Sequence, residues 1–427
     1  MSIATTAAPA PEANRQGRSL RLLVGVHDGS LSGVNTYVEH VAAAAATAML
    51  DVTLLVAHDE LAAEVGSRLE GVRVVSLRMQ PITAGQRRGE RLSPAYAAHR
   101  LATGLAAARP WIGAGYEVAH LNHPHLAAAV RPLAARVFVA AWFYPHSASG
   151  RAISTWRHSG RRFPRSVGLA VKGVLHHRND ARGYRAADTV VAPTRALADQ
   201  LRRAGFDAVQ CTPPARVLGD LQDAATDRRR PAGSAPRLLV CGGDLGHPRK
   251  NVGLALDALA LLGARGERLE LEVVGGNAGA LRSRLAQLPI GVRVTVIGRL
   301  PAAEVHRRMR AADLLLVPSL FEEWGYVAVE AALQGTPVVT LPVYPFAEML
   351  EPPLGFAASG LGAAEYAEAI LAALQSSAGR RQVADMAELR FGLAAAGDRL
   401  AVIWLGTAGS GNEDGWLSSP VPGRPLQ

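Results

Sequence analysis

The stretch that decides the fold is Arg21-Leu-Leu-Val-Gly-Val26, followed by the glycine- and serine-rich segment 27–35 and the alanine-rich segment 36–49. The first six residues are almost all apolar, which is typical of a strand buried on both faces of a parallel sheet. The next two segments predict a loop and a helix, and residues 51–57 predict a second strand. A strand, a glycine loop, a helix and a strand open a βαβ unit, so we expect an α/β fold with a doubly wound parallel sheet.

The same pattern starts again near residue 237, after further short apolar runs in the first half. These runs predict strands at 72–77, 118–121, 137–142 and 189–192, and a helix from Thr194 to Ala204. In the second half we expect strands at 237–241, 269–274, 292–297, 313–317 and 337–341, and helices at 251–262, 301–310, 327–334, 363–374 and about 383–404. Two such halves place a ligand cleft between the carboxyl ends of their strands.

The domain boundaries follow from these two patterns. We expect a first Rossmann-like domain over residues 20–212, a proline- and arginine-rich connection over 213–236, and a second Rossmann-like domain over 237–405. The last helix of the second domain is a candidate to pack back on the first. The polar start, 1–19, and the Gly-, Ser- and Pro-rich end, 406–427, predict disorder.

Length and composition favour a two-domain protein of the cytoplasm. The chain has 427 residues, whereas single cores stop growing at roughly 250–300. Its longest apolar run, Val41 to Leu50, is shorter than the ~20 residues that a membrane span needs, and residues 1–19 lack the apolar core of a signal peptide. Cys211 and Cys241 cannot form a disulfide framework, so a reducing compartment is expected.

The net charge of +10 raises the question of an anionic partner. Only Lys172 and Lys250 are lysines, so Arg supplies 44 of the 46 basic residues, which indicates a GC-rich bacterial coding bias. Segment 151–185 holds nine basic residues and one acid, Asp180. It predicts a grip on an anionic acceptor or on lipid headgroups at the inner face of the cell membrane, or simply a solvated helical face. No nucleic-acid motif accompanies the charge, so we expect no nucleic-acid partner.

The stretch Pro318-Ser-Leu-Phe-Glu-Glu-Trp-Gly-Tyr-Val-Ala-Val-Glu330 carries the most chemical information. Glu322 falls in a loop after a predicted strand, and Glu330 lies about one turn into the next helix. Gly325 lets the backbone approach a ligand closely, and the helix start offers free N–H donors. Because an ionised carboxylate only accepts hydrogen bonds and a sugar diol supplies two donors, the pattern indicates a site for sugar hydroxyls.

A second motif, Gly242-Gly-Asp-Leu-Gly-His-Pro-Arg-Lys-Asn251, lies between a predicted strand and helix. Glycines, basic side chains and a helix N-terminus together make a cradle for a diphosphate. The phosphate contacts therefore fall on Arg249 or Lys250.

These features resemble the retaining GT-B glycosyltransferases of family four (group 1), with their Glu-x7-Glu signature. The resemblance covers the C-terminal half, including Gly335-Thr-Pro-Val-Val339. It implies a GT-B fold and an enzyme that moves a sugar from a nucleoside-diphosphate donor. It further implies that Glu322 contacts the donor sugar near the reacting centre as a catalytic residue and that Glu330 binds the ribose. The chain departs from the family at Asp244, where an arginine is usual, so another arginine would have to supply that phosphate contact.

In the first domain, the resemblance implies that a glycine loop over Asp28 to Asn35 closes on the diphosphate. Gly33 is the best match for the closest approach and Gly29 the alternative, while Arg299 of the second domain falls where the base pocket forms. In relatives a histidine after a first-domain strand contacts the donor sugar. Four histidines follow such strands; His146 is the first choice and His123 the runner-up, and the others are His120 and His125.

No metal or other cofactor is expected, because neither a completed histidine cluster nor an Asp-x-Asp motif is present. The expected activity is transfer of a hexose-type sugar from a UDP- or GDP-sugar to a hydroxyl of a lipid, polysaccharide or natural product. Two alternatives stay open. One is a nucleotide-sugar epimerase of the same fold, and the other is a non-catalytic basic protein that binds membrane or nucleic acid.

Overall fold

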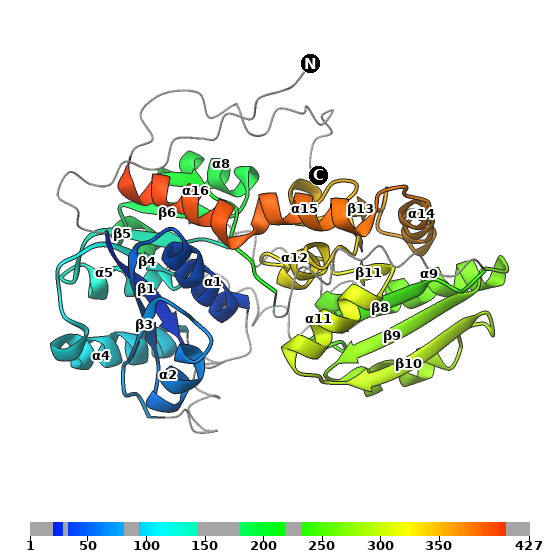
Figure 1. Ribbon diagram of the computed structural model, residues 1–427, viewed down its shortest axis with the longest axis horizontal. Coiled ribbons are helices and arrows are strands. Elements are labelled where there is room, and N and C mark those ends of the chain that lie inside the picture. The colour runs from blue at the N-terminus through cyan, green and yellow to red at the C-terminus, as the bar shows by residue number, and fades with distance from the viewer. Residues whose placement is uncertain (1–19, 29–32, 81–93, 143–179, 218–232, 407–427) are drawn as a thin grey trace, which may run out of the picture.

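The computed structural model describes residues 20–28, 33–80, 94–142, 180–217 and 233–406. Within these residues two parallel β-sheets lie side by side along the long axis, each flanked by helices (Figure 1). The doubly wound α/β architecture expected from the sequence is confirmed. The expected disordered ends, His146, Gly29 and most of the basic segment 151–185 lie outside the described residues.

The first sheet has seven strands in the order β3-β2-β1-β4-β5-β6-β7. Its strands are β1 (Arg21–His27), β2 (Asp51–Val56), β3 (Val72–Ser76), β4 (Tyr116–Leu121), β5 (Ala134–Ala140), β6 (Thr189–Ala192) and β7 (Ala208–Gln210). The helices named in this half are α1 (Gly33–Thr47), α2 (Asp59–Gly66), α4 (Pro94–Ile112), α5 (Ala127–Val130) and α8 (Arg195–Arg203). Strand β1 is central and almost wholly buried, as expected for a parallel strand covered on both faces.

The second sheet has six strands in the order β10-β9-β8-β11-β12-β13. Its strands are β8 (Arg237–Gly242), β9 (Leu269–Gly275), β10 (Val292–Gly298), β11 (Leu314–Val317), β12 (Val338–Thr340) and β13 (Gly355–Ala357). Its helices include η3 (Pro248–Lys250), α9 (Val252–Ala264), η4 (Ala278–Leu281), α10 (Arg282–Leu285), α11 (Ala302–Ala311), α12 (Tyr326–Leu333), α13 (Phe346–Met349), α14 (Ala363–Leu374), α15 (Arg380–Phe391) and α16 (Leu393–Leu405). The edge strands β7 and β13 were not expected, because each is three residues long and, unlike β12, is not made of β-branched residues throughout.

The single helix expected over about 383–404 is wrong, because the chain breaks it at Gly392. The backbone of Gly392 is extended, with ψ of 156°, and this residue ends α15 and precedes α16. A Cβ atom here would lie 2.5 Å from the carbonyl oxygen of Glu388, so only glycine fits this sharp return. Glycine also disfavours a continuous helix by about 1 kcal/mol relative to alanine.

The break sends the two helices to different halves of the molecule. Helix α15 packs on α12 of the second half, and α16 crosses to pack on α1 of the first (Figure 1). The approach of α16 is close, because a Cβ on Gly397 would lie 2.4 Å from the carbonyl oxygen of Ala44 in the alanine-rich part of α1. Trp404 of α16 is fully buried, and its indole N–H donates to Nδ1 of His120 in β4 at 3.1 Å.

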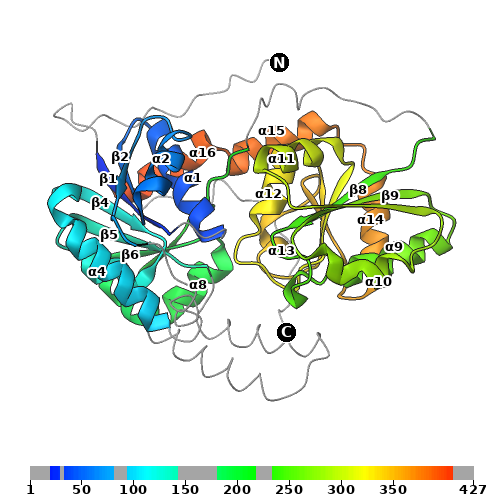
Figure 2. The same cartoon turned by 90° about the horizontal axis from the view of Figure 1, so that it is seen from below.

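The carboxyl ends of the two sheets face each other, as three contacts across the junction show. Gly33, after β1, lies beside Tyr326, after β11, with 3.6 Å between a Cβ placed on Gly33 and Cδ2 of Tyr326. The Tyr344 hydroxyl, after β12, donates to the carbonyl of Trp142, after β5, at 2.9 Å. The third contact joins Glu348 of α13 to the first turn of α8. Figure 2 shows α13 and α8 on facing sides of the junction.

We expect the Glu348→Ala change to loosen this junction. Its carboxylate accepts from the backbone N–H groups of Arg195 and Ala196, the latter at 3.2 Å, and so caps the positive end of α8. An exposed charge at a helix end contributes a few tenths to about 1 kcal/mol. The variant should unfold at a slightly lower temperature and show a larger radius of gyration in solution scattering.

The matched control for this change is Glu351→Ala. Glu351 pairs with Arg390 inside the second half and, among the described residues, makes no side-chain hydrogen bond or ion pair across the junction. Equal radii of gyration for the two variants would show that Glu348 does not hold the halves together.

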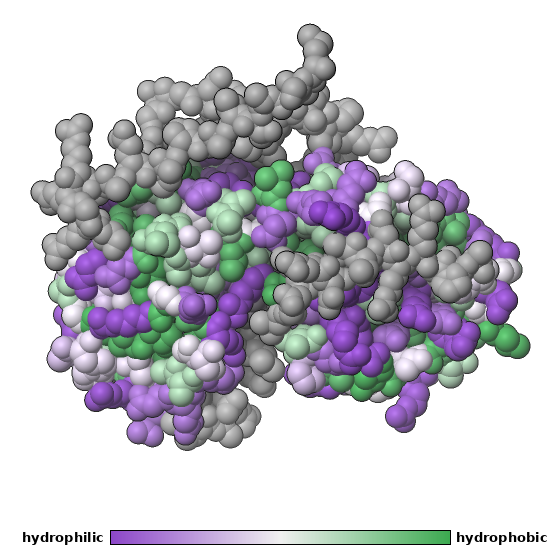
Figure 3. All heavy atoms as spheres, viewed as in Figure 1, coloured by the Kyte–Doolittle hydropathy of each residue, from purple (hydrophilic) through white to green (hydrophobic). Residues whose placement is uncertain are grey.

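The surface carries no continuous apolar belt on the face drawn in Figure 3, where hydrophilic and hydrophobic residues are interspersed over both halves. In the part of the chain that the structure describes, no helix combines the length and apolarity that crossing a bilayer requires.

Candidate active site

Three residues singled out in the sequence meet at the carboxyl end of the second sheet. The Glu322 carboxylate, in the loop after β11, accepts from the guanidinium of Arg249 at 2.6 Å and from Nζ of Lys250 at 2.6 Å. Both cations come from η3, in the loop after β8, which lies next to β11 in the sheet. The Ser319 hydroxyl donates to the same carboxylate at 2.8 Å. Strand order thus brings together residues 72 positions apart into one charged cluster.

The cluster keeps Glu322 ionised. Burial alone would raise the pKa of this carboxyl, but the charges of Lys250 and Arg249 and the hydrogen bonds from Lys250 and Ser319 outweigh it. The pKa of Glu322 therefore lies below its ordinary value. Arg249 and Lys250 are each partly exposed, so both can also reach a ligand outside the cluster.

The shape of the Glu322 loop depends on Gly325. This residue has φ of +84° and precedes the first residue of α12. A Cβ here would lie 2.6 Å from the ring of Phe346, so the loop can fold over Phe346 only with glycine. Trp324 turns inward and stacks edge-on against Phe391, with ring centroids 6.1 Å apart. The start of α12 and its free N–H groups are thereby held at the junction.

Asp244 shapes the loop after β8, where the family pattern would have an arginine. Its carboxylate accepts from the backbone N–H of Gly246 and from the side-chain amide of Asn277, each at 3.1 Å. Arg299, after β10, donates to the carbonyl of Gly243 at 2.9 Å, one residue away. Arg299 thus lies against this loop, beside the ends of β8 and β9.

Glu330 lies apart from the charged cluster, on α12. Nε2 of His306, from α11, is 3.6 Å from its carboxylate, and the His306 side chain is buried. The Tyr326 hydroxyl, one turn earlier on α12, is buried and has no hydrogen-bond partner among the described residues. Its ring packs edge-on against His40 of α1, with ring centroids 5.2 Å apart. The first turns of α12 therefore contact the first half of the molecule directly.

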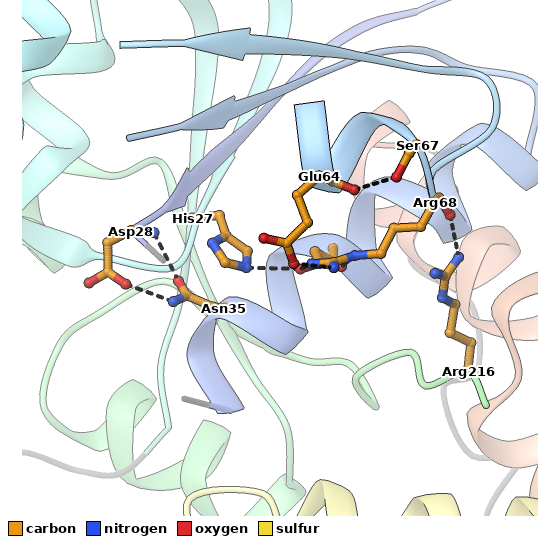
Figure 4. Close-up of polar contacts among 8 residues, drawn as sticks. His27, Asp28, Asn35, Glu64, Ser67, Arg68 and Arg216 are labelled. Atoms are coloured by element: carbon orange, nitrogen blue, oxygen red, sulfur yellow. Dashed lines mark hydrogen bonds and ion pairs between the residues drawn. The ribbon is translucent and has the colours of Figure 1, made fainter. Parts of the chain in front are cut away.

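The glycine loop of the first half is tied together at its two ends (Figure 4). The Asn35 side chain donates to the Asp28 carboxylate at 2.7 Å and accepts from the Asp28 backbone N–H at 3.3 Å. Just behind, His27 and Arg68 both bind the carboxylate of Glu39 on α1. These contacts fix the start of α1, and with it Gly33, opposite Tyr326 of the second half.

The histidines after β4 differ in their surroundings. His120 is fully buried, and burial lowers its pKa to about 3. Because Trp404 can only donate to its Nδ1, the proton sits on Nε2, which donates to the Tyr37 hydroxyl at 2.6 Å. His120 is thus a core residue that cannot reach a ligand. Nε2 of His123 has no hydrogen-bond partner within the described part of the chain. Burial lowers the pKa of this ring, and the charge of Asp28 opposes that shift.

Of the residues proposed from the sequence, the structure brings Glu322, Arg249 and Lys250 into contact and sets Gly325 beside them. Gly33 faces α12, while Glu330 and Arg299 lie at separate positions around the same sheet edge. Sequence reasoning missed Ser319, His306, Tyr326 and Asn277, which act through tertiary contacts. Ser319 and Tyr326 lie inside the quoted Glu-x7-Glu stretch, whereas His306 lies in no recognisable motif.

No cluster of three or more histidine, cysteine, aspartate or glutamate side chains that could hold a metal ion occurs among the described residues.

Two family models match the chain, one on each half. The model described as glycosyl transferase 4-like domain matches residues 32–214, and the model described as glycosyl transferases group 1 matches residues 227–390. The second match contains the whole charged cluster together with Glu330 and Arg299.

Similar proteins carry related names. A D-inositol 3-phosphate glycosyltransferase of Nocardia farcinica is 40% identical over 85 residues, 18% of this chain and 19% of the relative. A 2-deoxystreptamine glucosyltransferase of Streptomyces kanamyceticus is 38% identical over 86 residues, 20% of this chain and 22% of the relative. The matched stretches thus span about a fifth of these relatives. A sucrose-phosphate synthase structure from Thermosynechococcus elongatus shares the fold, with TM-score 0.64 and 19% identity over 91% of this chain and 99% of that one.

Proposed function

This chain belongs to the group 1 glycosyltransferases of GT-B fold, and from that premise we propose that it moves a hexose-type sugar from a UDP- or GDP-sugar to a hydroxyl group. The donor would lie at the junction between the facing carboxyl ends of the two sheets. Neither a metal nor another cofactor is part of the proposal. We also propose a cytoplasmic location, where nucleotide sugars are made.

One observation carries the proposal. The start of α12, with Arg249 and Lys250 next to it, faces the start of α1 at Gly33. Two helix N-termini and two cations converging on one place suit a ligand with two adjacent negative charges, because each offers N–H donors or positive charge. A nucleoside diphosphate has this chemistry.

The proposed reaction retains the configuration of the sugar. As the bond between the sugar carbon and the diphosphate breaks, Arg249, Lys250 and the backbone amides stabilise the charge that develops on the leaving oxygen. The acceptor hydroxyl attacks the same face and forms the new bond, and the departing phosphate oxygen takes its proton. Glu322 would hold the sugar and the two cations in position relative to each other. The reaction forms no covalent bond between the sugar and the enzyme.

We expect Glu330→Ala to weaken donor binding more than turnover. The carboxylate would accept hydrogen bonds from the ribose in both the ground state and the transition state, so its loss removes uniform binding. A hydrogen bond to a charged group contributes about 1.5–3 kcal/mol, which corresponds to a roughly 10- to 100-fold rise in donor KM. Steady-state kinetics should show this rise with kcat within about threefold of wild type. The exposed Glu267→Ala variant should match wild type; a fall in kcat alone for Glu330→Ala would contradict the ribose role.

The acceptor class is also a proposal. The names of both relatives mention a cyclitol, which is inositol 3-phosphate in one and 2-deoxystreptamine in the other. Cyclitol hydroxyls are therefore the first acceptors to test, ahead of lipids and polysaccharides.

Incubation with nucleotide sugars tests the proposed function. With donor alone, a glycosyltransferase gives only slow hydrolysis, and with an acceptor it gives free nucleoside diphosphate and a glycosylated product seen by mass spectrometry. A new nucleotide sugar formed without any acceptor would instead show an epimerase. The absence of turnover for every UDP- and GDP-sugar would overturn the proposal.

A further inference from the structure

The loop that carries Glu322 holds a second carboxyl group on the next residue, Glu323. Glu322 accepts from Arg249, Lys250 and Ser319. Glu323, by contrast, has no side-chain hydrogen bond or ion pair with any of the residues that the structure describes. The two adjacent carboxyl groups therefore have opposite surroundings.

The neighbours of Glu323 restrict where its side chain can lie. Glu322 turns toward η3, and Trp324 turns inward against Phe391 with 3% of its surface exposed. Gly325 then fixes the loop over Phe346. Glu323 is partly buried and close enough to η3 for the charges of Arg249 and Lys250 to act on it. Its carboxyl group thus belongs to the same sheet edge as the proposed donor site.

The physical chemistry of an unpaired, partly buried carboxyl differs from that of Glu322. Burial raises the pKa of Glu323; the charge of Arg249 opposes this and that of Glu322 adds to it, and the net shift is upward. The charges that face Glu323 are those of Arg249 and Lys250 from η3 and of Glu322 from its own loop. Both cations already pair with Glu322, and a bound diphosphate would favour the neutral form of Glu323 further.

A neutral carboxyl group both donates and accepts hydrogen bonds, whereas the ionised Glu322 only accepts. Two carboxyl groups whose pKa values are pushed apart by their surroundings usually have different tasks in one site. Its partly exposed carboxyl group is open to a ligand, and a ligand that supplies both a donor and an acceptor matches it. Vicinal hydroxyls of a sugar do so.

We propose that Glu323 is a specificity-determining residue that binds a pair of hydroxyl groups on the transferred sugar of the donor. This inference rests on the proposed donor site. The diphosphate would take Arg249 and Lys250, and the sugar attached to it would then lie along the loop of Glu322 and Glu323. The arrangement of hydroxyls on the sugar ring would decide which donors fit.

The experiment compares wild type with Glu323→Gln and Glu323→Ala, using UDP-glucose, UDP-galactose, UDP-N-acetylglucosamine and GDP-mannose as probes. For the preferred donor, the alanine variant should lose about 10-fold in kcat/KM and discriminate less between sugars that differ in one hydroxyl. Its affinity for the matching nucleoside diphosphate alone should stay within about twofold of wild type. The glutamine variant should keep most of the activity that wild type shows below the raised pKa of Glu323, because an amide also donates and accepts.

The pH dependence of kcat/KM is a second measurement, and it would not change if Glu323 had only a structural role. Wild-type kcat/KM should fall as the pH rises through the raised pKa of Glu323, because the ionised form can no longer donate. The glutamine variant should lack this fall.

Three results would overturn the inference. The alanine variant could keep wild-type kcat/KM and donor preference. The glutamine variant could lose as much as alanine, which would point to an ionised carboxylate binding an amino group. Both variants could lose nucleoside-diphosphate affinity and thermal stability together, which would show a structural role. A wild-type protein that binds and turns over none of the probes would instead overturn the donor site itself, and the inference with it.

Discussion

Glu322→Ala is expected to lower kcat/KM for sugar transfer by about 1,000-fold. The change removes the acceptor for the sugar hydroxyls and also releases Arg249 and Lys250, which the carboxylate holds at 2.6 Å each. Loss of one preorganised electrostatic group in an active site commonly costs about 10²–10³-fold in kcat, and here three groups lose their arrangement together. Steady-state kinetics with the nucleotide sugar that wild type prefers measures the effect.

Two further variants show whether the loss has this cause. Glu322→Gln keeps the shape but not the charge, so it should lie between wild type and alanine. The exposed Glu70→Ala variant should match wild type. Circular dichroism and thermal unfolding identify a loss that comes from misfolding, since removing a carboxylate from between two cations also destabilises the fold. Normal turnover by a folded Glu322→Ala protein would show that Glu322 is not part of the active site.

Trp404→Ala is expected to lower the free energy of unfolding by about 3–5 kcal/mol, the usual cost of deleting a large buried aromatic side chain. Trp404 is fully buried between α16 and the first half, and its indole N–H is the donor to Nδ1 of His120. The change leaves both a cavity and an unpaired ring nitrogen. Urea denaturation followed by circular dichroism measures it.

Trp404→Phe keeps a six-membered aromatic ring in the same place, and it removes the N–H together with the rest of the five-membered ring. It should cost about 1–3 kcal/mol, the penalty for a buried acceptor left without its donor. Val402→Ala, on the exposed side of α16, should change stability by at most about 0.5 kcal/mol. A Trp404→Ala protein within 1 kcal/mol of wild type would show that α16 is not docked on the first half as described.

The fold and the centre of the candidate site were predictable from the sequence for physical reasons. Buried parallel strands leave long apolar runs, and the glycine loops after residues 26 and 241 mark where each half begins. Glu322, Arg249 and Lys250 follow neighbouring strands, β11 and β8, whose carboxyl ends must share one edge of the sheet. Their convergence follows from the strand order of the sheet, in which β8 and β11 are neighbours.

Other features of the structure depend on tertiary contacts that no local sequence pattern indicates. The break at Gly392 looks like an ordinary helix glycine until α15 and α16 pack on different halves. His120 looked like a possible ligand contact, yet Trp404, 284 residues away, makes it a core residue. His306 lies in no recognisable sequence motif, and only the structure shows that it lies close to Glu330 on the adjacent helix. The role of Glu323 likewise depends on what Glu322 already binds.

The central claim is that the second half binds a nucleoside diphosphate through Arg249 and Lys250. Thermal unfolding with increasing UDP, GDP, ADP or TDP tests it most directly, because a ligand specific for the folded state stabilises it by about 2.7 kcal/mol at 100 times its Kd. We expect one of the uridine or guanosine nucleotides to raise the midpoint in a saturable way. The Arg249→Ala/Lys250→Ala variant should lose this rise, and Arg265→Ala, which removes an exposed arginine of the same half, should keep it. No rise with any nucleotide, or an equal rise in the double variant, would contradict the account.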